Sequence, residues 1–93
     1  MRVKNIIGSS NSLPPAGYSS WLDFWKAHYH GNQPLRCAAY GHGSEHADLV
    51  GAHVKKVDSS DNSWYIVPLC KALNASTEEF YVNDDMMVPE NQD

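Results

Sequence analysis

The residues with the clearest chemical potential are the cysteines and histidines in the middle of the chain. Cys37 and Cys70 are separated by 32 residues, which permits one disulfide, and each stands in a context that resembles a metal knuckle. His42 and His46 lie four residues apart and would chelate a metal from one face of a helix, but the glycines on either side of His42 disfavour a helix there. Metal binding is therefore the first chemistry to consider for this segment.

The other histidines have simpler interpretations. His28 and His30 are two residues apart and do not share a helix face, which favours an interaction with a helix C-terminus over metal binding. His53 lies in an alternating stretch and is either a half-buried strand residue or a general base. The sequence has no glycine-rich phosphate-binding motif and no serine nucleophile elbow.

Length and composition restrict the class of protein. A chain of 93 residues has room for one domain and buries about 60–65% of its unfolded surface, so a metal or a disulfide would help a thin core. With 42% hydrophobic and 19% charged residues, it is neither disordered nor a coiled coil. No apolar run approaches the roughly 20 residues of a membrane helix, and no signal-peptide segment is present. We therefore expect a cytoplasmic protein without a membrane partner.

Charge is distributed unevenly along the chain. The net charge is −4, but residues 1–57 carry a net +3 and residues 58–93 a net −7. Such asymmetry can mark a basic binding face, although a net +3 is weak and a solvated surface with an acidic tail explains it as well. The overall acidity argues against non-specific nucleic-acid binding as the main role.

The N-terminal half is predicted to contain one strand and one helix. Residues 2–7 form the expected strand, and the helix is expected to begin after an N-cap at Ser20 and to end at Gly31. Aromatic residues at a four-residue spacing indicate that one side of this helix faces the core: Trp21, Trp25 and Tyr29.

The C-terminal half is predicted to contain a hairpin and a second helix. Residues 49–57 alternate, residues 63–67 are rich in β-formers, and a polar turn lies between them. Pro68 is expected to end the second strand. Residues 70–80 are then expected to form a helix, and residues 84–93 a frayed acidic tail.

The order of the predicted elements is that of a treble clef: a cysteine knuckle comes first, then a hairpin, then a helix that begins at a second cysteine. Residues 49–54 (LVGAHV) and 64–74 (WYIVPLCKALN) resemble the ββα-metal core of the HNH endonuclease superfamily. The sequence is most similar to small bacterial HNH-like zinc-finger proteins of unknown function. The resemblance covers residues 37–80.

The resemblance implies two catalytic residues. In the HNH family a histidine at the end of the first strand activates water, and an asparagine or histidine on the helix binds the catalytic metal; His53 and Asn74 stand at these positions. The asparagine that orients the histidine is replaced by Tyr65. Glu78 and Glu79 stand where a nuclease would carry basic residues for phosphate. These departures weigh against cleavage.

The resemblance also implies a zinc site, in which the ligands would be Cys37, His42 and Cys70, with His46 or His53 as the fourth. The family's second ligand of each pair is missing, because Tyr40 and Leu73 stand at the matching positions. Three outcomes follow: zinc is bound, the site is empty with Tyr40 and Leu73 packed into it, or Cys37 and Cys70 form a disulfide.

These features predict a small α+β domain over residues 1–93, with a treble-clef core that packs a hairpin beside flanking helices. As its function we expect a non-catalytic binding or scaffold module with a protein or a nucleic acid as partner. A metal-dependent HNH-type nuclease and a zinc-stapled structural domain are the alternatives, and zinc is the one cofactor implied. An exposed uncharged face around Trp64 and Tyr65 would indicate a protein partner.

Overall fold

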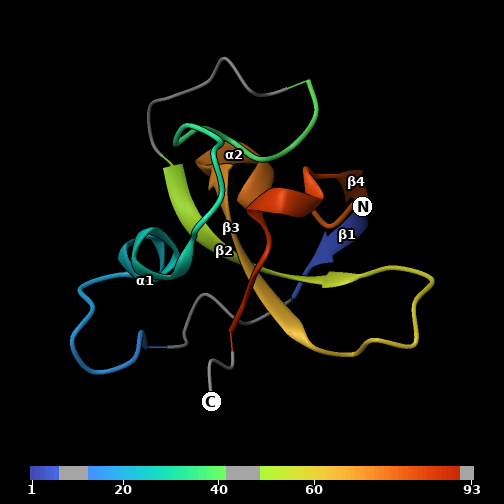
Figure 1. Ribbon diagram of the computed structural model, residues 1–93. Coiled ribbons are helices and arrows are strands. Elements are labelled where there is room, and N and C mark those ends of the chain that lie inside the picture. The colour runs from blue at the N-terminus through green and yellow to red at the C-terminus, as the bar shows by residue number, and fades with distance from the viewer. Residues whose placement is uncertain (7–12, 42–48, 91–93) are drawn as a thin grey trace.

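The computed structural model describes residues 1–6, 13–41 and 49–90. Within these residues the chain forms an antiparallel five-stranded sheet with two short α-helices and a 3-10 helix, which confirms a small α+β domain (Figure 1). The elements in chain order are β1 (Arg2–Asn5), α1 (Trp21–His28), β2 (Leu49–Lys56), β3 (Trp64–Cys70), α2 (Lys71–Asn74), β4 (Phe80–Tyr81), η2 (Asp84–Met86) and β5 (Val88–Pro89). Neither α-helix in the described part of the chain has the length and apolar character that a membrane crossing requires.

The hairpin predicted from the alternating pattern is the centre of the sheet. The strand order is β4-β1-β2-β3-β5, and the β2–β3 register runs from Leu49 opposite Cys70 to Lys55 opposite Trp64. β1 pairs with the outer side of β2, so that Lys4 stands opposite Lys55. Residues opposite each other in an antiparallel pair share a face, so these registers determine which side chains can act together.

The expectation that Pro68 ends the second strand is wrong, because β3 continues to Cys70. Pro68 stands opposite Gly51 at a position whose backbone groups point away from β2. Its carbonyl accepts a hydrogen bond from the Ala38 N–H at 2.8 Å on that side. The missing proline N–H therefore removes no hydrogen bond from the β2–β3 ladder.

The helix predicted after Ser20 is present as α1. The Ser20 Oγ accepts a hydrogen bond from the Asp23 N–H at 3.0 Å, which caps the helix as expected. The helix ends at His28 rather than near Gly31, because the Tyr29 backbone is extended. Trp25 is buried and its ring stacks on Tyr29, with centroids 4.4 Å apart. The aromatic stripe is therefore part of the core, as predicted.

The helix predicted over residues 70–80 is short and ends at Asn74. The Asn5 side-chain amide donates to the carbonyls of Leu73 and Ser76 at 3.0 and 2.8 Å. The Asn5 amide thus supplies hydrogen bonds that backbone N–H groups would supply in a longer helix. In the turn that follows, the Ser76 hydroxyl accepts a hydrogen bond from the Glu78 N–H. A distant side chain therefore ends a helix that local propensity would continue.

The segment expected to be a frayed tail is ordered as far as Glu90. Met86 and Val88 are buried at 0% and 4% exposure, and β5 pairs with Tyr65 and Ile66 of β3. The Trp25 indole N–H donates to the Met86 carbonyl at 2.7 Å, which fixes this segment to α1. Apolar burial and a buried hydrogen bond thus outweigh the acidic composition; residues 91–93 lie outside the described part.

α1 lies against β2 and β3, as Figure 1 shows. Gly51 is the point of closest approach, because a Cβ at this position would overlap the backbone of Trp21 and Leu22. The absence of a side chain at Gly51 therefore allows the start of α1 to lie directly on β2. This contact places Trp21 over the middle of the sheet.

We expect Gly51→Ala to lower the free energy of unfolding by about 2 kcal/mol or more, because the added methyl group meets backbone that cannot move aside. The matched control is Ser60→Ala, at an exposed residue between β2 and β3, which should leave the free energy of unfolding nearly unchanged. Urea unfolding of the two variants provides the comparison. Equal losses of stability would contradict this role of Gly51.

Candidate functional site

The two cysteines of the predicted zinc site lie close together. The Cys70 N–H donates to the Cys37 Sγ at 3.2 Å, and both residues are buried free thiols. His42 and His46 lie outside the described residues. Among the residues that are described, no group of three or more cysteine, histidine or acidic side chains could hold a metal. Zinc binding and the Cys37–Cys70 disulfide therefore stay predictions.

The two positions at which ligands are missing differ in environment. Tyr40 is 65% exposed, whereas Leu73 packs against the core. An empty site filled by both side chains would require both to be buried. The structure therefore supports packing for Leu73 and not for Tyr40.

His53 lies in the middle of β2 and is buried at 3% exposure. It is enclosed by two indoles: the Trp21 ring is 4.5 Å away between centroids and the Trp64 ring is 5.9 Å away, both in edge-to-face geometry. Burial lowers the pKa of His53 from its ordinary value. The imidazole is thus neutral at pH 7 and lies beneath α1.

This environment is unfavourable for the general base that the HNH resemblance implies. A general base has to reach the water that it activates, and His53 has almost no exposed surface. Tyr65 does not orient it, because Tyr65 is on the opposite face of β3 and donates its hydroxyl hydrogen to Asp61 at 2.5 Å. The hydrogen bonds and ring contacts of the described residues do not link His53 to Asn74, which ends α2. The proposed catalytic pair gains no geometric support.

One acidic side chain does approach His53. The Glu90 Oε2 lies 3.9 Å from the His53 Nε2, which has no hydrogen-bond partner among the described residues. Burial raises the pKa of Glu90. A small closure of this distance would let a neutral imidazole donate to the carboxylate.

The sheet brings two lysines and a tryptophan into one row on the same face as His53. Lys4 of β1 stands opposite Lys55 of β2, and Lys55 stands opposite Trp64 of β3. Lys4 is exposed, Lys55 is half-buried and Trp64 is 40% exposed. The row formed by Lys4, Lys55 and Trp64 is called the basic–aromatic row below.

The two lysines of the row repel each other. Neither has an ion pair with an acidic group in the described part of the chain, whereas the neighbouring Lys56 pairs with Asp61 at 3.0 Å. Like charges placed directly opposite each other on a sheet are destabilising. An anion bound between Lys4 and Lys55 would attract both ammonium groups and so offset the repulsion between them.

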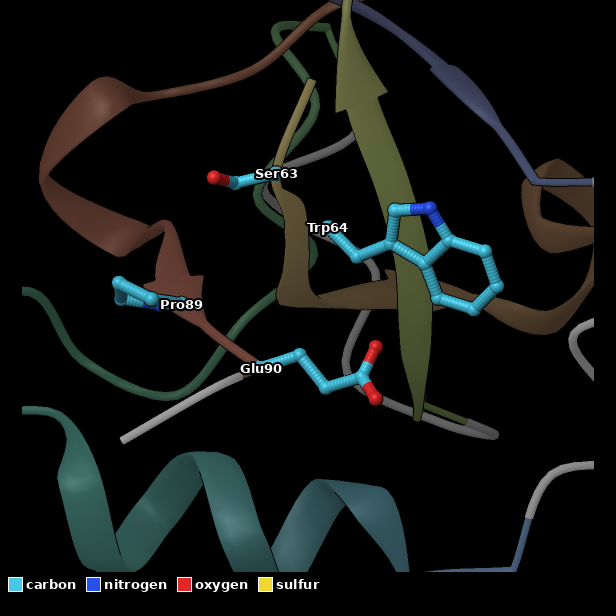
Figure 2. A pocket seen from close by; sticks show the side chains of 4 residues that line it. All are labelled: Ser63, Trp64, Pro89 and Glu90. Atoms are coloured by element: carbon cyan, nitrogen blue, oxygen red, sulfur yellow. The ribbon is translucent and has the colours of Figure 1, made fainter. Parts of the chain in front are cut away.

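A hollow lies at each end of the row. One has a volume of about 400 Å³ and is lined by Lys4, Asn5, Ile6, Lys55 and Thr77. The other has a volume of about 440 Å³ and is lined by Ser63, Trp64, Pro89 and Glu90. Figure 2 shows the Trp64 indole and the Glu90 carboxylate extending to the same side, while the Ser63 hydroxyl points away from them. One hollow is therefore basic, and the other combines an indole with a carboxylate.

Comparisons of the chain with protein-family models, with curated proteins and with solved structures found no match. The functional assignment therefore rests on the geometry of the site.

Sequence reasoning did not identify the basic–aromatic row. The one signal was the net positive charge of residues 1–57. Lys4 and Lys55 are 51 positions apart in the sequence, and only the β1–β2 register brings them together. Glu90 was missed because the C-terminal segment was expected to be frayed.

The burial of His53 predicts a pH dependence of stability. Because the pKa in the folded chain lies below the ordinary 6.5, the unfolded chain binds a proton that the folded chain does not, so the free energy of unfolding should decrease as pH falls below 6.5. The raised pKa of Glu90 has the opposite effect on stability. Its contribution to the free energy of unfolding is present at low pH and is lost as pH rises through the pKa of the folded chain.

His53→Phe should reduce the loss of stability below pH 6.5, because the ring that resists protonation is gone. His30→Gln, which removes an exposed histidine, is the control for the loss of a histidine as such. Urea unfolding at a series of pH values measures both. An unchanged pH dependence in His53→Phe would show that His53 does not titrate as described.

Proposed function

We propose that this protein is a non-catalytic binding module whose ligand is a single-stranded nucleic acid. The observation that carries the proposal is the basic–aromatic row, in which two lysines that have no acidic partner among the described residues lie beside an exposed indole on one face of the sheet. The ammonium groups would contact phosphates, and the indole would stack on a base.

The surroundings of Trp64 favour nucleic acid over a protein partner. A protein-binding face would require a broad uncharged surface around Trp64 and Tyr65. Tyr65 instead faces the opposite side of β3, where Lys56 lies over its ring and Asp61 accepts its hydroxyl hydrogen. Trp64 has a lysine opposite it and Glu90 beside it. The exposed indole thus lies in a charged surface.

A single strand suits this surface better than a duplex. Bases in a duplex are stacked on each other, whereas those of a single strand are free to stack on a protein side chain. The chain carries a net −4, so phosphates are attracted locally at the row and repelled elsewhere. Binding should therefore involve few phosphates and have a shallow salt dependence, with each phosphate contact contributing about 0.7 to the slope.

The role of each residue in the row is tested with a fluorescent single-stranded DNA of mixed sequence at low ionic strength. Lys4→Ala and Lys55→Ala should each weaken binding about fivefold and lower the salt slope by about 0.7, because each removes one phosphate contact. Trp64→Ala should weaken binding by about 5- to 100-fold through the loss of stacking. Fluorescence anisotropy measures the dissociation constants.

Lys71→Ala is the matched control, because Lys71 is an exposed lysine on α2, outside the row. It should leave the affinity unchanged. An equal loss in Lys71→Ala, or no binding by the wild type at low ionic strength, would contradict the proposal. The strand should also stay full length in the presence of Mg²⁺; its cleavage would contradict a non-catalytic role.

A further inference from the structure

Glu90 is held beside Trp64 by the backbone of the sheet. β5 places Pro89 opposite Tyr65, and the Glu90 N–H donates to the Trp64 carbonyl at 3.0 Å. The two side chains line the same hollow, and Figure 2 shows both extending to the same side. The backbone of β5 therefore places the Glu90 side chain next to the exposed indole of Trp64.

The environment of Glu90 restricts how its carboxylate can act. The side chain is 33% exposed, and its Oε2 lies 3.9 Å from the buried His53 Nε2. His53 is in turn held between the rings of Trp21 and Trp64. The carboxylate thus has a fixed polar neighbour on its inner side and the hollow on its outer side.

A carboxylate on a surface that binds phosphates lowers the affinity for every strand, because it repels the backbone. Its position beside the stacking face gives it access to the edge of a base. A carboxylate only accepts hydrogen bonds and can accept two at once. It would therefore favour a base that presents two neighbouring donors.

We propose that Glu90 selects guanine as the base that stacks on Trp64, an inference that rests on the proposed function. Guanine presents its ring N1–H and its exocyclic N2–H side by side, which matches the two carboxylate oxygens. Adenine, cytosine and thymine each present a donor beside an acceptor, and the acceptor faces the carboxylate unfavourably.

The test compares thymine oligonucleotides of equal length that carry one central guanine, adenine or cytosine, or thymine throughout. The wild type should bind the guanine strand about 5- to 100-fold more tightly than the others, which is the range for a bidentate contact to a base. Fluorescence anisotropy at one fixed ionic strength gives the four dissociation constants.

Glu90→Gln should abolish the preference for guanine, because an amide offers one acceptor and one donor. The same variant should bind the all-thymine strand more tightly than the wild type, since a repelling charge is gone. The backbone bond from Glu90 to Trp64 is retained in this variant, and circular dichroism verifies the fold. Glu78→Gln, at an exposed acidic residue, is the control and should keep the guanine preference.

The outcomes separate the two proposals. Equal binding of all four strands, with the dependence on Lys4 and Lys55 intact, would overturn the role of Glu90 and leave the proposed function standing. A guanine preference that persists in Glu90→Gln would also overturn that role. Binding of none of the strands, or binding only of an arginine- and lysine-containing peptide at Trp64, would overturn both proposals.

Discussion

The antiparallel pairing of β2 with β3 is the constraint on which the rest of the structure depends. It places Lys55 beside Trp64, Gly51 beside Pro68 and His53 on the face that α1 covers. A shift of β2 by one residue would turn Lys55 and His53 to the face opposite Trp64. Since β1 then pairs with β2 and β5 with β3, the row and the carboxylate of Glu90 both derive their positions from this register.

The face of the sheet that carries His53 has a part that α1 buries and a part that is exposed to solvent. Near Gly51 the backbone of α1 lies against the sheet, and Trp21 encloses the imidazole of His53. Towards the hairpin turn the helix no longer covers the strands, and Lys55 and Trp64 reach solvent. His53 lies at the boundary and contacts both indoles. A buried neutral histidine is thus better explained as support for the open surface than as a catalytic base.

Local sequence patterns predicted what local interactions determine. The alternation in β2, the aromatic stripe of α1 and the Ser20 cap each depend on residues close in sequence, and the structure contains all three. Contacts between distant residues determine the rest. The side chain of Asn5 ends α2. The Ala38 N–H donates a hydrogen bond to the Pro68 carbonyl, so that β3 continues through the proline. The Trp25 indole N–H holds the C-terminal segment by its hydrogen bond to the Met86 carbonyl. The basic–aromatic row could not be predicted for the same reason, because its two lysines are 51 positions apart in the sequence and only the β1–β2 register brings them together.

Binding at the basic–aromatic row is tested most directly by titrating the isotopically labelled protein with a single-stranded oligonucleotide and following its amide and indole NMR signals. The largest shifts should occur at the backbone amides of Lys4 and Lys55 and at the Trp64 indole. The NMR signal of the Trp25 indole N–H, which donates a hydrogen bond to the Met86 carbonyl in the core, should not shift. Shifts concentrated instead at the exposed Tyr40 and Tyr81 would place the binding surface on another part of the molecule and contradict binding at the basic–aromatic row.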